Sequence, residues 1–103
     1  MEKACVIIPC RYSSSRFMGK PLSKLNKKYL MEYPYRAAKK AKNISEVFIA
    51  TDDDRIAKVC ENLGMNFIMT HNKHFTGSDR IAEAVRKIKK KYSLIINVQG
   101  DEP

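Results

Sequence analysis

Long hydrophobic runs are missing from this sequence of 103 residues. Its longest apolar stretches, such as residues 5–9 and 94–96, are far shorter than the roughly 20 residues that a helix needs to cross a bilayer. The first residues, Met1 to Lys3, also lack the charged start and long apolar stretch of a signal peptide. We therefore expect no membrane span and a cytoplasmic location.

Cysteine is scarce and follows no ligand or disulfide pattern. The three cysteines, Cys5, Cys10 and Cys60, are odd in number and show no CxxC spacing. No pair of histidines stands near them in zinc-finger register, so neither a disulfide framework nor a zinc site is indicated. We expect reduced thiols that fill space in the core.

The familiar glycine-rich phosphate motifs are also absent. Gly19 and Lys20 have neither the earlier glycine nor the following Ser or Thr of a Walker loop, and no GxGxxG occurs. A phosphate site in this chain must therefore be built from other groups.

Positive charge, in contrast, is abundant. Twenty Lys and Arg against eleven Asp and Glu give a net charge of +9, which attracts nucleic acid, an acidic membrane surface or small phosphate-bearing molecules. A nucleic-acid-binding domain is the weakest of these interpretations, because the chain has no recognition-helix motif or base-stacking aromatic sheet. Such a domain would also have to place Asp101 and Glu102 on the same rim as a basic loop.

Apolar β-branched runs alternate with helical periods along the chain. We expect strands at 4–8, 47–51, 66–69 and 94–98. We expect helices from Glu32 to Lys42, from the acidic N-cap at 52–54 to Leu63 with Gly64 as C-cap, and from Ser78 to Lys91. Pro34 is tolerated only in a first turn, which sets the start at Glu32. The order predicts one α/β domain over 1–103, with a doubly wound, mostly parallel sheet and Rossmann-like nucleotide-binding topology.

Helical spacing also predicts which side chains face the core. In the first helix this face comprises Tyr33, Ala37, Ala38 and Ala41, and in the third it comprises Ile81, Ala82, Val85 and Ile88. Residues 10–28 lack such a period and are expected to form a long loop.

Polar clusters follow each expected strand, at 11–20, 52–54, 71–80 and 99–102. Ligands of open parallel sheets bind outside the carboxyl ends of the strands. We therefore expect the four loops to converge on one rim.

The first of these loops carries three cations, Arg11, Arg16 and Lys20, together with the hydroxyls of Ser13 to Ser15. Guanidinium forks, a lysine ammonium and hydroxyls can together wrap a triphosphate. The alternative is an ordinary basic surface loop, and these residues alone leave both open.

The remaining rim clusters are individually weak signals. Asp101 and Glu102 suit Mg²⁺ with phosphates completing its shell, although two acids alone are common on surfaces. Residues 76–80 open a helix where a polar ligand could bind, or where Thr76 or Ser78 is a simple N-cap. Asp52 and Asp53 are expected as caps, and His71 and His74 as loop residues.

Four blocks in order resemble the 3-deoxy-manno-octulosonate (KDO) cytidylyltransferases. They are 8–16 (IPCRYSSSR) with 19–22 (GKPL), 50–53 (ATDD), 76–80 (TGSDR) and 97–103 (NVQGDEP). The last block distinguishes the chain from sialic-acid cytidylyltransferases, which share the first loop. Departures are mild, since Ser15 and Ser78 stand where threonine is usual and Cys10 replaces a common alanine.

The resemblance implies an enzyme that transfers CMP from CTP to the sugar acid KDO and releases pyrophosphate, for lipopolysaccharide or capsule precursors. It implies that Arg11 and Lys20 neutralise the triphosphate, that Ser14 and Arg16 help to place it, that Ser78 and Gln99 recognise the nucleoside, and that Asp101 binds Mg²⁺. Arg11, Lys20 and Asp101 are the implied catalytic residues.

Members of that family run to more than twice this length. The resemblance implies that the half of those proteins without a counterpart here supplies the sugar-acid pocket, a second metal-binding aspartate and most of a homodimer contact. We therefore expect a truncated, CTP-binding half-domain, with CTP and an acidic sugar as partners and no nucleic acid. A catalytically silent CTP-binding module and a sibling enzyme acting on another acidic sugar remain alternatives.

Overall fold

A computed structural model describes residues 4–12, 20–70, 77–88 and 94–97, with the backbone alone for Lys20, 77–79 and 94–97. Four parallel strands form its main sheet: β1 (Ala4–Pro9), β4 (Ile44–Thr51), β5 (Phe67–Met69) and β6 (Leu94–Asn97). Their spatial order is β5-β4-β1-β6. The predicted α/β class with a parallel sheet is confirmed.

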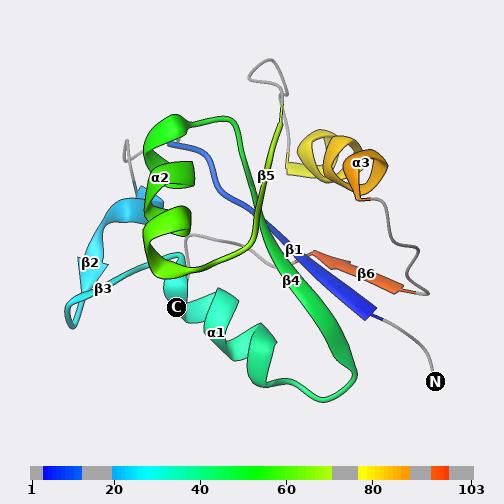
Figure 1. The fold of residues 1–103 in the computed structure, drawn as a ribbon, viewed down its shortest axis with the longest axis horizontal. Coiled ribbons are helices and arrows are strands. Elements are labelled where there is room, and N and C mark those ends of the chain that lie inside the picture. Colours follow the sequence, from blue (N-terminus) through cyan, green and yellow to red (C-terminus); the bar gives the residue numbers. More distant parts are fainter. Residues whose placement is uncertain (1–3, 13–19, 71–76, 89–93, 98–103) are drawn as a thin grey trace.

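Three helices cover the two faces of this sheet (Figure 1). Helices α1 (Glu32–Lys40) and α2 (Asp54–Leu63) pack on one face, and α3 (Gly77–Lys87) packs on the other. The chain moves outward from β1 to β4 and β5, and then returns past β1 to β6. The strand order therefore reverses between β1 and β6, which makes the sheet doubly wound.

The alternation of side chains along β1 divides the core in two. Val6 and Ile8 point to the face of α1 and α2, whereas Cys5 and Ile7 point to the face of α3. All four are at most 2% exposed. Such a strand, buried on both faces, explains why its sequence is continuously apolar.

The ends of α2 are where the sequence predicts them. The Asp53 carboxylate accepts the backbone N–H groups of Arg55 (2.8 Å) and Ile56 (3.3 Å), which confirms it as the N-cap. Asp52 is not a cap. Gly64, at φ 70°, ends the helix in the left-handed conformation that glycine adopts without strain.

Helix α1 starts at Glu32 with Pro34 in its first turn, as predicted, but it ends at Lys40 rather than Lys42. The predicted buried face is only partly correct: Ala38 packs against the core as predicted, but Tyr35 is buried whereas Ala37 and Ala41 are exposed. The Tyr35 hydroxyl accepts the backbone N–H of Asn66 at 2.9 Å, which turns this ring into the core.

Helix α3 departs from its predicted extent and in part from its predicted face, although Ile81 and Ile88 pack against the core as predicted. It ends at Lys87, and Ile88 follows outside the helix. Arg80 and Ala84 are 0% exposed, whereas Ala82 is exposed and Val85 is 39% exposed. The buried face is rotated because the Arg80 side chain finds polar partners beneath the rim.

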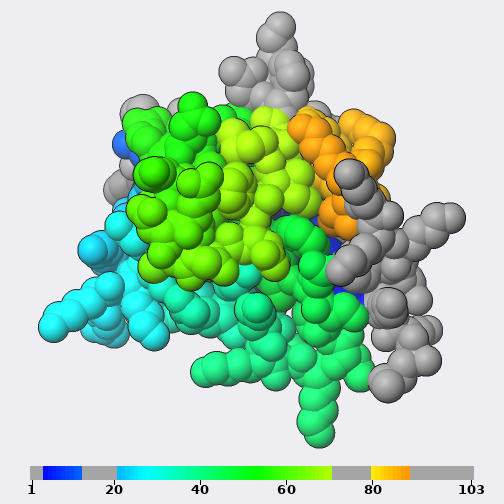
Figure 2. Space-filling view, viewed as in Figure 1, coloured from blue at the N-terminus to red at the C-terminus, as the bar shows by residue number. Residues whose placement is uncertain are grey.

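The predicted loop over 10–28 contains regular structure. It includes the 3-10 helix η1 (Lys20–Leu22) and a hairpin of β2 (Lys24–Leu25) and β3 (Lys28–Tyr29), which projects beyond the helices (Figure 2). The two turn residues, Asn26 and Lys27, have positive φ. Sequence reasoning missed this turn because Lys27 stands where glycine is the usual signal.

The second strand is longer than predicted, since β4 begins at Ile44 rather than Val47. Pairing with β1 extends to the Ala4–Ile44 register and keeps the polar residues Ser45 and Glu46 within the strand. Tertiary pairing overrides the local pattern at this end.

Candidate functional site

The carboxyl ends of the parallel strands lie at one edge of the sheet, as predicted. Two backbone hydrogen bonds connect the chain at these ends: the N–H of Cys10 donates to Ala50 O, and the N–H of Thr70 donates to Thr51 O, both at 2.8 Å. The described part of the rim thus comprises residues 10–12, 51–53 and 70, with the first turn of α3 nearby.

The reversal of strand order falls between two candidate loops. Strands β1 and β6 pair in parallel up to the Ile7–Asn97 register. The segments that follow these strands contain Arg11 to Lys20 and Gln99 to Asp101. Such a reversal opens a crevice at the carboxyl ends of the strands, which is the usual ligand site of a doubly wound sheet.

The predicted site residues are only partly within the described structure. Arg11 is exposed on the rim after β1, the backbone of Lys20 begins η1, and the backbone of Ser78 lies in the first turn of α3. The others, together with the two histidines, lie outside the described residues: Ser14, Arg16, His71, His74, Gln99 and Asp101.

A buried polar cluster beneath the rim was not predicted. The Arg80 guanidinium donates from Nη1 to Thr70 Oγ1 at 2.6 Å, and its Nη2 lies 3.6 Å from Asp52 Oδ2. The Arg80 side chain is fully buried, and that of Asp52 is 19% exposed. The cluster joins the ends of β4 and β5 to the first turn of α3, two residues after Ser78.

A sequence signal for this cluster exists. Arg80, Ala84 and Ile88 are spaced four residues apart, so they share one side of a helix, and the last two are apolar. An arginine in line with core positions indicates a buried cation with partners. Thr70 carries no comparable signal.

A second unpredicted contact fixes the chain just after β1. The Arg55 guanidinium carbon lies 3.2 Å from the centroid of the Tyr12 ring, in the cation–π range. Arg55 also donates from Nη2 to Asp53 Oδ2 at 2.8 Å and from Nε to Oδ1 at 3.1 Å. These hydrogen bonds hold the pKa of Asp53 below its ordinary value.

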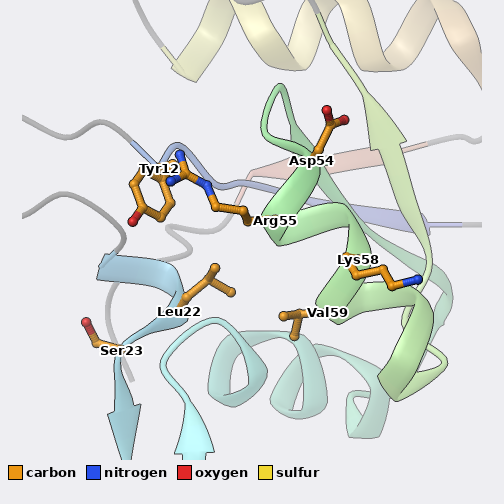
Figure 3. A pocket seen from close by; sticks show the side chains of 7 residues that line it. All are labelled: Tyr12, Leu22, Ser23, Asp54, Arg55, Lys58 and Val59. Carbon is orange, nitrogen blue, oxygen red and sulfur yellow. The ribbon is translucent and has the colours of Figure 1, made fainter.

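The same contact borders an open pocket with a volume of about 740 Å³ (Figure 3). The pocket lies between η1 and α2, with Leu22 and Val59 as its apolar lining. Lys58 also lines it, but its ammonium points away from Tyr12 in Figure 3. The pocket thus has an apolar lining bordered by charged residues of both signs, Asp54, Arg55 and Lys58.

The cysteines have the predicted role. All three are free and buried, and burial raises the pKa of Cys5 to about 11 and that of Cys60 to about 12. Both thiols are therefore protonated near neutral pH. Among the residues with described placement, no group of three or more His, Cys, Asp or Glu could hold a metal ion. No helix in the described ranges is long and apolar enough to cross a membrane.

Comparison with known proteins agrees with this geometry. Residues 5–103 match the family described as Cytidylyltransferase. The chain is 50% identical over 109 aligned positions to 3-deoxy-manno-octulosonate cytidylyltransferase of Thermodesulfovibrio yellowstonii, covering 100% of this chain and 42% of the relative. It is 46% identical over 103 residues to the protein of the same name in Leptospira interrogans, covering 100% of this chain and 41% of that relative.

A solved structure of CMP:2-keto-3-deoxy-manno-octonic acid synthetase complexed with CTP has the same fold. It superposes with a TM-score of 0.92 at 40% identity, over 98% of this chain and 41% of that one. The chain therefore spans about two fifths of the length of the proteins that it resembles.

Proposed function

The chain belongs to the cytidylyltransferase family, and we propose that it is the CTP-binding part of an enzyme that transfers CMP to the sugar acid KDO. The observation that carries the proposal is the superposition of 98% of the chain on a synthetase complexed with CTP. The reversal of strand order between β1 and β6 supports it, because the segments that follow both strands carry the candidate residues.

The proposed reaction is a substitution at phosphorus. The anomeric hydroxyl oxygen of the sugar acid bonds to the α-phosphorus of CTP and loses its proton to solvent. The bond from the α-phosphorus to the bridging oxygen breaks, and pyrophosphate leaves with that electron pair. No covalent intermediate on the protein is required, so the protein acts by positioning and by electrostatic stabilisation.

Each candidate residue has a role in this scheme. Arg11 and Lys20 neutralise the negative charge of the triphosphate, and Ser14 and Arg16 place it. Ser78 and Gln99 bind the nucleoside. Arginine forks and a lysine ammonium suit phosphate oxygens because they combine full charge with several hydrogen-bond donors.

Mg²⁺ is the proposed cofactor, and Asp101 is the residue that would hold it. A carboxylate oxygen is the ligand type that Mg²⁺ prefers, and Mg²⁺ in nucleotide sites takes its other ligands from phosphate and water. When bound, the ion neutralises charge on the phosphates.

A CTP-binding module without turnover is the second candidate. The superposition that carries the first candidate supports this one equally, because binding of CTP does not depend on conversion of the sugar acid. The two candidates share the nucleotide site and differ in whether sugar acid is converted.

Calorimetry with CTP and ATP, with and without Mg²⁺, followed by a pyrophosphate-release assay with KDO, tests both. We expect CTP to bind more tightly than ATP and Mg²⁺ to strengthen its binding. Pyrophosphate release on addition of KDO supports the enzyme, and binding without release supports the module. Equal affinity for CTP and ATP would contradict both.

Two variants test the proposed roles. Lys20→Ala and Asp101→Ala should each weaken binding of Mg²⁺–CTP by about tenfold or more, since each removes a charged contact worth about 1.5–3 kcal/mol. Lys42→Ala and Glu61→Ala are matched controls, because both side chains are exposed away from the carboxyl rim. Unchanged affinity in the first two variants rejects the assigned roles.

A further inference from the structure

We propose that Arg55 is a positioning residue for Arg11, the first cation of the candidate phosphate-binding loop, acting through the ring of Tyr12. The inference rests on the proposed function, because it assumes that the loop beginning at Arg11 binds the triphosphate. It adds Arg55 on α2, which is distant in the sequence from the cations of that loop.

The Arg55 guanidinium is itself held in place by Asp53. Both oxygens of Asp53 accept hydrogen bonds from its guanidinium, at 2.8 and 3.1 Å. The same carboxylate caps α2 through the backbone N–H groups of Arg55 and Ile56. The guanidinium plane is therefore fixed by the rigid first turn of a helix.

The fixed guanidinium lies on the Tyr12 ring, with 3.2 Å between its carbon and the ring centroid. Figure 3 shows the Arg55 side chain reaching from α2 across to the ring. Arginine suits this task because its planar, delocalised cation stacks on aromatic rings, which an ammonium does less well.

The contact between Arg55 and Tyr12 also fixes the position of the Arg11 backbone. On one side of it, the Cys10 N–H is bonded to Ala50 O at 2.8 Å, and on the other side the Tyr12 ring is held by Arg55. The backbone of Arg11 is thus fixed at both neighbours, whereas its side chain stays exposed on the rim. Fixing the backbone beforehand lowers the entropy that binding must overcome.

Calorimetry on the full chain, with Mg²⁺–CTP and with CMP, tests this role. Arg55→Met and Tyr12→Leu should each weaken CTP about fivefold, as expected for loss of one exposed cation–π contact. CMP, which lacks the β- and γ-phosphates, should lose less, so the ratio of CTP to CMP affinity falls. Tyr12→Phe keeps the ring and should retain the CTP affinity of the unaltered chain, whereas Arg55→Lys should retain only part of it.

Lys58→Met is the matched control. It removes one positive charge one turn further along α2, from a side chain that points away from Tyr12. We expect its CTP affinity to stay within about twofold of the unaltered chain, because an exposed charge that has no partner among the described residues contributes little. Thermal midpoints of all variants separate loss of binding from loss of folding.

The outcomes distinguish this inference from the proposed function. If the unaltered chain does not bind CTP, the proposed function fails and the role of Arg55 fails with it. If the unaltered chain binds CTP and a folded Arg55→Met protein keeps the same ratio of CTP to CMP affinity, the role of Arg55 alone is rejected. An equal loss in Lys58→Met would also reject it, because charge rather than stacking would then be responsible.

Discussion

The two faces of the sheet are built differently. On the face of α1 and α2, ten buried residues form one apolar cluster, which includes Ile8 and Tyr35. On the face of α3, the described side chains form a cluster of four, in which Ile7 and Ala84 take part. The polar cluster of Arg80 lies on this second side, where α3 approaches the ends of β4 and β5.

The difference lies in where each side places its buried charge. On the side of the larger cluster, Glu32 is 5% exposed at the start of α1, and it pairs with the backbone N–H of Tyr29 and with Arg36. The smaller face buries a guanidinium beside Thr70 and Asp52, next to the candidate nucleotide rim. Departures from an apolar core are expected at functional sites, because binding groups have to be supported from beneath.

The largest effect should come from truncating neighbouring isoleucines of β1. Ile8 and Ile7 are both 0% exposed and point to opposite faces. We expect Ile8→Ala to lower the free energy of unfolding by about 4 kcal/mol and Ile7→Ala by about 2.5 kcal/mol, because the cost grows with the cavity that remains. Urea titration of the two variants measures the difference.

This pair is internally matched, since the two changes remove the same atoms from adjacent positions of one strand. Equal losses in the free energy of unfolding would mean that both faces are packed alike and would contradict the difference between them. A larger loss for Ile7→Ala would reverse it.

The next effect should come from Arg80. Arg80→Met leaves Asp52 and the Thr70 hydroxyl without this cation, and we expect a loss of about 2–3 kcal/mol in the free energy of unfolding. Arg86→Met, on the exposed side of the same helix, is the control and should change it by less than about 0.5 kcal/mol. If Arg80→Met leaves the free energy of unfolding unchanged, the α3 face accepts an apolar replacement.

The smallest effect concerns the N-cap of α2. Asp53→Ala should lower the free energy of unfolding by about 1 kcal/mol through loss of the cap. Asp53→Asn should lower it less, because its side-chain oxygen can still accept hydrogen bonds from the backbone N–H groups of α2. The pKa of Asp53 is lowered in the folded chain from its ordinary value of 3.8. Its charge therefore stabilises the fold above that value, and this contribution is lost as the pH falls through the lowered folded pKa.

Urea titrations of the unaltered chain and of Asp53→Asn between pH 7 and pH 2 check this sign. The gap in stability between the two should be constant down to about pH 4 and then close. A gap that widens in acid would contradict the assigned direction.

The sequence predicted the elements whose signals are local. The acidic run before α2 and Gly64 after it mark both ends of that helix, and Pro34 marks the start of α1. The apolar strands and their alternation with helices predicted the parallel sheet. Periodicity predicted the buried faces of α1 and α3 only in part, because a Tyr hydroxyl and an Arg guanidinium found partners elsewhere in the fold.

For the candidate site, the sequence predicted its place on the rim but not its support. Arg11, Lys20 and Ser78 are placed at or next to that edge of the sheet by the elements that carry them, and the roles of all seven candidate residues stay predictions. The contacts of Arg55 with Tyr12 and of Arg80 with Thr70 and Asp52 were missed because each joins residues that are distant in the sequence and belong to different parts of the fold.

By itself the sequence determined the order of the main-sheet strands and the three α-helices, the caps of α2 and the loops that carry the candidate chemistry, because these depend on residues within a turn or two of one another. Only the tertiary structure decided that Arg80 is buried beneath the rim and that Arg55 stacks on Tyr12. Those contacts form between separate elements, where burial and electrostatics depend on the arrangement of the whole sheet.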